Sequence, residues 1–444
     1  MLNRVPYATK TADRPPLTSE RLTNLFVEKA PADAKAQTVL FNTPGQVAFC
    51  ELADIRGFHE MSGVLYAVAG EKLYSVDSAG TSTELGDIPG SDRVYMADNG
   101  TQLCIVANPT GYIYATSLAE ITDPDWPGAS TVTYMDGYFI FSRADSGQFF
   151  ISALLDGTDI DALDFATAER SPDNVIRVIA DHGELWLFGT KTIEVWYNSG
   201  RADFPFERIN AAAIERGCKS AATVTKMDNS LVWLGDDNIV YRANGYVPQR
   251  ISDHGLEEDI ESLTGAVGWS YTQEGHKFYV LTYSSLTAVY DAATGLWHNR
   301  QTYGQGDWAP KHYCYCYDKH LVSGEKIYYL DRSVYADDGG DIIAEIVSVP
   351  YGDNTISLVM RRFQLDIEAG VGLGTGEDPK ATLSFSDDGG KTWSNEIEGS
   401  LGRVGNYSNR IVWRRLGRFR QRILRVRISD PVKRAVMGGF VDYG

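Results

Sequence analysis

Short apolar runs separated by Gly, Asp or Ser turns recur seven times between residues 65 and 331. In each repeat two apolar runs flank one turn, and the second run reaches an aromatic residue, often followed by Asp or Asn. This pattern predicts β-hairpins. The expected strand pairs are 65–68 with 73–77, 103–106 with 112–114, 138–141 with 149–151, 185–188 with 193–196, 231–234 with 239–241, 278–281 with 287–291, and 321–323 with 326–331.

The spacing of these hairpins predicts the fold class. The aromatic residues of the second strands lie about 36 to 49 residues apart, which is the period of four-stranded propeller blades. Those aromatics are Tyr74, Tyr114, Phe150, Trp196, Tyr241, Tyr290 and Tyr329. Because one hairpin cannot bury its apolar face alone, neighbouring hairpins must stack. We therefore predict an all-β protein whose body, residues 47–340, is a β-propeller of six or seven blades.

The two flanks of this body have different patterns. Residues 1–46 show little periodicity and hold prolines at positions 6, 15, 16, 31 and 44, which predicts an extended N-terminal arm with one helical turn at residues 19–26. Residues 341–444 contain longer apolar runs at 356–368, 380–386 and 422–429. They predict a C-terminal β-layer or closing blade that carries a basic segment.

Charge is distributed unevenly along the chain. Residues 403–434 contain 11 Lys or Arg and one acid, a net charge of +10, which leaves −28 on the rest of a chain whose total is −18. Such asymmetry predicts an interaction segment. Arg dominates the segment, which favours bidentate pairing with carboxylates or phosphates; the alternative is a charged sheet edge that prevents aggregation. After Arg422 the alternation of apolar and charged positions along the strand shifts by one residue, which predicts a bulge or bend near Ile423.

Cysteine usage and hydropathy indicate the compartment in which the chain assembles and whether it enters a membrane. Five cysteines without regular spacing predict no disulfide framework and assembly in a reducing cytoplasm. The polar start of the chain predicts no signal peptide, and no apolar run reaches the ~18 residues that a membrane span needs. We therefore expect no membrane insertion by this chain.

Two motifs suggest chemistry. One stretch fits the Asp-box, a hairpin turn closed by Asp and Gly above a packed Trp, and comprises Ser386, Asp388, Gly390, Thr392 and Trp393. The Asp-box occurs in sialidases, but a single copy without a catalytic constellation favours a structural turn. His312, Cys314 and Cys316 share one strand face and are metal-ligand types, yet their spacing fits a core face better than a zinc site. We expect no catalytic residues, no metal or cofactor, and no enzymatic activity.

Several segments resemble one protein family. RIVWRRLGR at 410–418 and VRISDPV at 426–432 resemble the C-terminal segment of the packaged-DNA stabilisation proteins, also called tail hub or nozzle proteins, of short-tailed bacteriophages. TIEVWYNSG at 192–200 and IERGC at 214–218 are similar to the family's central segment. LSFSDDG at 383–389 and GEKLY at 70–74 extend the likeness over most of the chain.

The resemblance implies a structural protein of the virion tail, assembled in the host bacterial cytoplasm. It implies a hexameric ring below the portal and its adaptor that closes the DNA exit channel, retains packaged DNA and conducts it at ejection. The implied partners are identical subunits, the portal-adaptor protein, tail needle, spike or fibre proteins, and passing DNA without sequence specificity. Two alternative functions are a propeller glycosidase of the phage tail and a generic propeller adaptor for one protein partner.

The basic segment suggests how such a ring holds together. Arginines that line a DNA channel would bind phosphates, and each contact would have to break as DNA slides past. We therefore expect the arginines at subunit or adaptor interfaces, where they pair with carboxylates. The expected interface residues are Arg414, Arg415, Arg418, Arg420 and Arg422.

Overall fold

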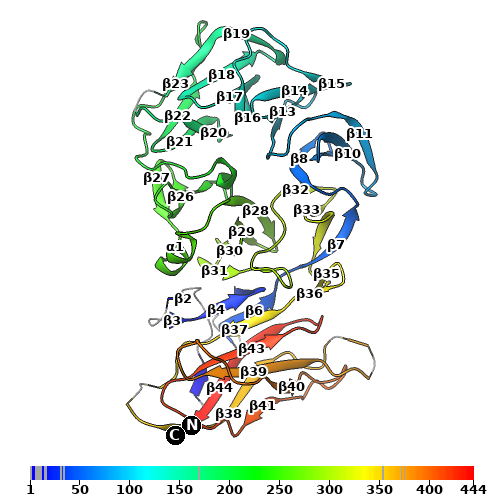
Figure 1. Ribbon diagram of the computed structural model, residues 1–444, viewed down its shortest axis with the longest axis vertical. Coiled ribbons are helices and arrows are strands. Elements are labelled where there is room, and N and C mark those ends of the chain that lie inside the picture. The colour runs from blue at the N-terminus through cyan, green and yellow to red at the C-terminus, as the bar shows by residue number, and fades with distance from the viewer. Residues whose placement is uncertain are drawn as a thin grey trace.

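The structure is a computed structural model that describes residues 3–5, 13–14, 18–30, 33, 36–168, 171–352, 355–371, 373–374 and 376–444, with side chains from residue 20 onward. Much of the predicted arm, including the prolines at 6, 15, 16 and 31, lies outside these residues. Figure 1 shows a ring of small sheets above two layers of longer strands. None of the helices in the described ranges is long and apolar enough to cross a membrane.

All seven predicted hairpins are present in the ring, each as the two middle strands of a four-stranded antiparallel unit. Units 1 to 4 comprise β8 (Ile55–Met61), β9 (Val64–Ala69), β10 (Lys72–Val76), β11 (Ser82–Asp87); β12 (Tyr95–Asp98), β13 (Leu103–Ala107), β14 (Thr110–Tyr114), β15 (Leu118–Glu120); β16 (Ala129–Met135), β17 (Tyr138–Arg143), β18 (Gln148–Ala153), β19 (Asp156–Thr167); and β20 (Val175–Asp181), β21 (Glu184–Gly189), β22 (Ile193–Asn198), β23 (Phe206–Arg208). Units 5 to 7 comprise β24 (Thr225–Lys226), β25 (Leu231–Leu234), β26 (Val240–Asn244), β27 (Val247–Arg250); β28 (Val267–Gln273), β29 (His276–Thr282), β30 (Thr287–Asp291), β31 (Leu296–Asn299); and β32 (Tyr313–Cys316), β33 (Lys319–Ser323), β34 (Ile327–Asp331), β7 (Gly45–Cys50).

Apolar side chains between neighbouring units hold the ring together. Val106 of unit 2 and Phe141 of unit 3, for example, are fully buried in one cluster. The first strands of the units face the centre, and the ring closes where β32 contacts β8. Unit 7 takes its fourth strand, β7, from a segment that precedes unit 1 in sequence. The chain therefore closes the ring by joining an early strand to the last hairpin.

Below the ring, two layers of strands pack face to face as a sandwich. One layer has the order β41-β38-β44-β6-β5, with β1 and β42 beside it, and the other runs β4-β37-β43-β39-β40. Phe363 and Leu365 of the first layer meet Leu383 and Val426 of the second in one buried core. The strands are β1 (Asn3–Val5), β4 (Arg21–Thr23), β5 (Leu25–Lys29), β6 (Thr38–Asn42), β37 (Ala344–Val347), β38 (Leu358–Ile367), β39 (Lys380–Ser386), β40 (Ile397–Ser400), β41 (Ile411–Arg414), β42 (Arg418–Phe419), β43 (Ile423–Ile428) and β44 (Ala435–Tyr443).

The remaining elements are short. The helix α1 (His254–Ile260) begins at Asp253, whose side chain accepts a hydrogen bond from the backbone N–H of Leu256 at 2.9 Å. The other elements are β2 (Asp13–Arg14), β3 (Thr18–Ser19), the 3₁₀ turn η1 (Ala221–Thr223), β35 (Ala336–Asp337) and β36 (Gly340–Asp341).

The predicted helical turn at residues 19–26 is wrong, because this segment joins the ring to the sandwich as strands. β4 pairs with β31 of unit 6 on one side and with β37 on the other. Between β4 and β5, Asn24 is 3% exposed and has φ +56°. Its side-chain amide donates to the carbonyls of Gln301 and Ile343, at 3.1 and 2.9 Å, and accepts from the backbone N–H of Gln301. Long-range pairing therefore overrides the local helical tendency.

A buried histidine also ties the ring to the sandwich. His276 of β29 contacts Asp291 of β30 through Nδ1 at 2.8 Å and Glu28 of β5 through Nε2 at 2.7 Å. The hydrogen bond with Asp291, followed by that with Glu28, raises the pKa of His276 to about 9, although burial opposes the shift. His276 is therefore a charged bridge between two carboxylates at neutral pH.

This bridge should make stability depend on pH in one direction. Since the folded-state pKa of His276 is raised, its contribution is complete below its ordinary pKa, roughly 6.5, and is lost as pH rises through about 9. The free energy of unfolding of the wild type, relative to His276→Gln, should fall across that window by at most about 3 kcal/mol. Denaturation of both proteins below and above the window measures this difference. A difference that does not change with pH would contradict the proposed charge on His276.

Candidate functional site

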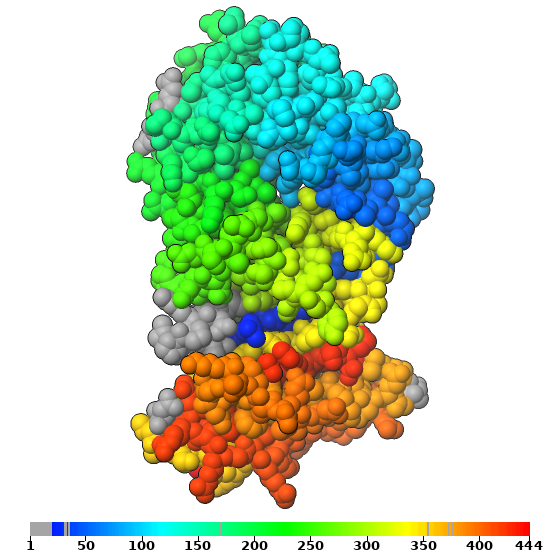
Figure 2. Space-filling view, in the orientation of Figure 1, coloured from blue at the N-terminus to red at the C-terminus, as the bar shows by residue number. Residues whose placement is uncertain are grey.

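The basic segment spans the sandwich: in Figure 1 β41 lies beside β38 at the end remote from the ring, whereas β43 lies beside β37 on the side nearer the ring. The surface at the remote end is orange and red in Figure 2. Arg414, Arg415, Arg418 and Arg420 are all exposed. Arg414 ends β41, Arg418 begins β42, and Arg420 donates through Nη1 to the carbonyl of Thr355 at 3.0 Å. We call these four side chains the arginine surface.

The arginine surface has few internal counter-charges. Within the described ranges, no carboxylate forms an ion pair with any of its four members. Arg414 stands directly opposite Arg362 in the antiparallel pair of β41 and β38, so two like charges share one face. Arg362 forms an ion pair with Asp442 of β44 at 3.6 Å, and this carboxylate partly offsets the two positive charges. The arginine surface therefore presents unneutralised positive charge to its surroundings.

Arg422 has a different role from the one predicted. Its side chain is only 1% exposed and donates to both carboxylate oxygens of Asp387 at 2.7 Å. It also donates to the carbonyls of Leu416 and Arg418, at 2.5 and 3.3 Å, and lies 3.9 Å from the centre of the Phe385 ring. Arg422 thus binds the two layers of its own sandwich and offers no atoms to a neighbour, so the interface prediction rests on the other four arginines.

The shift in the alternation of apolar and charged positions near Ile423 has a simple structural cause. β42 pairs with β38 of the first layer, whereas β43, beginning at Ile423, pairs with β39 and β37 of the second layer. The chain therefore crosses the sandwich between residues 419 and 423, and Arg422 is buried at the crossing.

The later arginines of the segment are also used within the chain. Arg427 of β43 contacts Glu345 of β37 at 2.6 Å and Glu396 at 3.2 Å, and Arg21 of β4 shares Glu345 at 2.6 Å. These pairs join three strands of the second layer. The exposed arginines of the first part of the segment, among them the arginine surface, remain available to partners.

The Asp-box forms the turn between β39 and β40. Asp388 accepts from the Ser386 hydroxyl at 2.7 Å and from the Thr392 backbone and hydroxyl at 3.0 and 2.6 Å, while the Gly390 N–H donates to Ser386 at 2.8 Å. These bonds, with that of the Thr392 hydroxyl first, lower the pKa of Asp388 below its usual range. Trp393 stacks with Arg425, whose guanidinium lies 4.1 Å from the ring centre. Both carboxylate oxygens of Asp388 thus hold the turn.

His312, Cys314 and Cys316 lie in two different environments. Cys316 is buried in a cluster with Cys50, and Cys314 packs against the same cluster. His312 borders the central channel of the ring. Among the described residues, no group of three His, Cys, Asp or Glu side chains is arranged to hold a metal ion.

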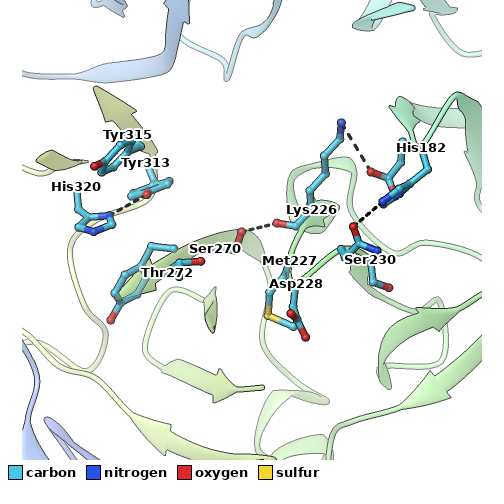
Figure 3. A pocket seen from close by; sticks show the side chains of 13 residues that line it. His182, Lys226, Met227, Asp228, Ser230, Ser270, Thr272, Tyr313, Tyr315 and His320 are labelled. Atoms are coloured by element: carbon cyan, nitrogen blue, oxygen red, sulfur yellow. Dashed lines mark hydrogen bonds and ion pairs between the residues drawn. The ribbon is translucent and has the colours of Figure 1, made fainter. Parts of the chain in front are cut away.

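One mouth of the ring holds an open pocket of about 570 Å³. Figure 3 shows its wall, with His182 and Lys226 on one side and Tyr313, Tyr315 and His320 on the other. The polar groups tie neighbouring units together: His182 contacts Asn229 at 2.7 Å, and the Ser270 hydroxyl donates to the Lys226 carbonyl at 2.5 Å. The pocket shares Ser270 and Tyr313 with the cavity at the centre of the ring, where His312 is the residue that the sequence analysis had considered.

Comparisons with known proteins agree with this architecture. Residues 9–335 match the family described as "Bacteriophage P22 Gp10, beta-propeller", and residues 348–444 match "Bacteriophage P22 Gp10, beta-sandwich". The tail hub protein gp10 of Salmonella phage P22 is 23% identical over 418 residues, which cover 84% of each chain. The predicted resemblance and the predicted propeller with a C-terminal β-layer are thereby confirmed.

Solved structures share only the general architecture. The computationally designed Ika8 protein is 12% identical with a TM-score of 0.42, covering 70% of this chain and 99% of its own. PorZ of Porphyromonas gingivalis is 11% identical with a TM-score of 0.40, covering 80% of this chain and 46% of its own. These scores carry no argument about function. The family matches span both the ring and the sandwich, and the chain therefore belongs to the bacteriophage P22 Gp10 family.

Proposed function

We propose that this chain is a structural tail hub of a short-tailed phage virion, which closes the DNA exit channel after packaging and conducts DNA at ejection. The match of both parts of the chain to the Gp10 family is the observation that carries this proposal. We further propose a division into an N-terminal arm at 1–46, a propeller body at 47–340 and a sandwich at 341–444. In this division the arm supplies β4, β5 and β6, of which β4 pairs with β31 of the body and with β37 of the sandwich.

The DNA passage should lie between subunits, because the centre of one propeller is too narrow for a duplex. The cavity on its axis has a volume of only about 300 Å³, at the lower end of small-molecule pockets. A duplex needs a far wider conduit. Identical subunits arranged around a common axis can provide one, and the family resemblance implies six copies.

The arginine surface is suited to holding such a ring or its adaptor. Four exposed guanidinium groups, which form no ion pair with a carboxylate of the described residues, can donate to carboxylates of another chain in bidentate pairs. The rest of the chain carries a net −28, which supplies carboxylates to neighbouring subunits and repels DNA phosphates from the passage. We propose that tail needle, spike or fibre proteins attach to the assembled ring.

We infer that the chain is not a glycosidase. Its Asp-box carboxylate, Asp388, is fully engaged in turn hydrogen bonds and is therefore not arranged as an acid, base or nucleophile. An assay on sialosides and host polysaccharide with the purified chain tests this inference. Turnover above that of a heat-inactivated sample would contradict it.

Phage particles made without this chain test the proposed function directly. Heads should package DNA and then release it, so little nuclease-protected DNA should remain with purified particles. Supplying the chain from a plasmid should restore protection. Particles that lack the chain and still retain a full genome would contradict the role as a closure of the exit channel.

A further inference from the structure

The central channel of the propeller contains a site that neither the fold nor the assembly role explains. Its cavity of about 300 Å³ is bordered by Arg93, Tyr95, Arg177, Trp269, His312 and Tyr313. Among the described residues that line it, none is Asp or Glu. The cavity shares Ser270 and Tyr313 with the open pocket shown in Figure 3 and therefore lies next to that mouth of the ring.

Arg177 is the principal feature of this cavity. It follows a register shift between Val175 and Arg177 in β20, and such bulges re-aim side chains. Its guanidinium crosses the channel and lies 4.3 Å from the centre of the Tyr95 ring on β12. Its Nε and Nη1 atoms are buried and have no hydrogen-bond partner. Two nitrogens of Arg177 therefore lack a hydrogen-bond acceptor among the described residues.

A second arginine adds to the positive charge. Arg93, just before β12, is half-buried and donates through Nη1 to the carbonyl of Lys311 at 3.2 Å. Burial lowers the pKa of Arg177, and the charge of Arg93 lowers it further. An arginine nevertheless stays protonated in proteins. Two cations therefore line one cavity that has no carboxylate among its described lining residues, in a chain whose net charge is −18.

An unpaired charge away from water is costly, so this arrangement suits an anion that supplies the missing partner. We propose that the propeller channel binds one small tetrahedral oxyanion of the phosphate or sulfate class, held between the guanidinium groups of Arg177 and Arg93. Guanidinium groups carry paired N–H donors, which suit the oxygens of such an anion. The small volume favours a free oxyanion over a nucleic-acid strand.

Calorimetric titration of the purified chain with inorganic phosphate, at constant ionic strength with chloride as the balancing ion, tests this site. We expect saturable binding of one phosphate per chain and a higher melting temperature in phosphate than in chloride. Arg177→Gln should weaken phosphate binding by about tenfold or more, because a hydrogen bond to a charged group is lost. Arg93→Gln should weaken it as well.

Arg143→Gln is the matched control, since Arg143 is an exposed propeller arginine whose hydrogen bond, at 2.6 Å, goes to Gln148. It should bind phosphate as the wild type does. Broadening of the ³¹P resonance of phosphate by the wild-type chain gives a second readout that needs no variant. No saturable phosphate binding by the wild type, equal binding by Arg177→Gln, or tighter binding of acetate than of phosphate would overturn the proposal.

Discussion

Replacing Arg414, Arg415, Arg418 and Arg420 together with Glu should leave the chain folded but reduce its incorporation into phage particles by more than about tenfold, because each lost interfacial pair costs several kcal/mol. The four side chains are exposed, so the monomer loses little. A Glu at position 414 would even face Arg362 favourably across the strand pair. The resulting particles should fail to retain DNA. Incorporation is measured by quantifying the chain in purified particles.

A second variant with the same change of charge separates a specific interface from a general electrostatic effect. It reverses four exposed cations elsewhere, namely Arg143, Lys191, Arg201 and Lys391. This control should assemble normally. Normal assembly of the arginine-surface variant, with only an altered ejection rate, would place these residues on the channel wall and contradict the interface proposal.

Arg422→Ala should destabilise the sandwich by about 3 kcal/mol, the lower end for a broken buried ion pair, because Asp387 is 42% exposed and can return to water. The loss comes mainly from the two backbone carbonyls that Arg422 satisfies and from its stacking on Phe385. Arg422→Lys should not restore stability, since an ammonium cannot form the bidentate pair. Denaturation followed by Trp fluorescence measures both effects.

Arg420→Ala is the matched control, because Arg420 lies two residues away, is exposed and makes one hydrogen bond to the Thr355 carbonyl. Its free energy of unfolding should change by no more than about 0.5 kcal/mol. Equal stabilities for Arg420→Ala and Arg422→Ala would show that the buried network of Arg422 contributes little.

The repeating hairpins were predictable because each is local in sequence. The apolar runs at 65–68 and 73–77, for example, form the directly paired strands β9 and β10. The fourth strand of unit 7 was not predictable in this way, since Gly45–Cys50 pairs with residues almost 300 positions later. The same holds for residues 19–26, whose strand partners lie in β31 and β37.

The candidate interface shows what strand alternation can predict about side-chain exposure and where that prediction fails. Alternation placed Arg418, Arg420 and Arg422 on one strand face, which assumes that one strand continues through all three. The chain instead crosses between layers, so Arg418 and Arg420 are exposed and Arg422 is buried. No sequence pattern identified Arg93 and Arg177, because they are single residues in separate units that meet only when the ring closes.

A reconstruction of the intact phage tail tests the central claim most directly. We expect several copies of this chain around the DNA axis in cyclic symmetry, with Arg414, Arg415, Arg418 and Arg420 in contact with carboxylates of a neighbouring subunit or the adaptor. The propeller axis of each copy should carry no DNA. A single copy per particle, or DNA density threading one propeller, would contradict the account.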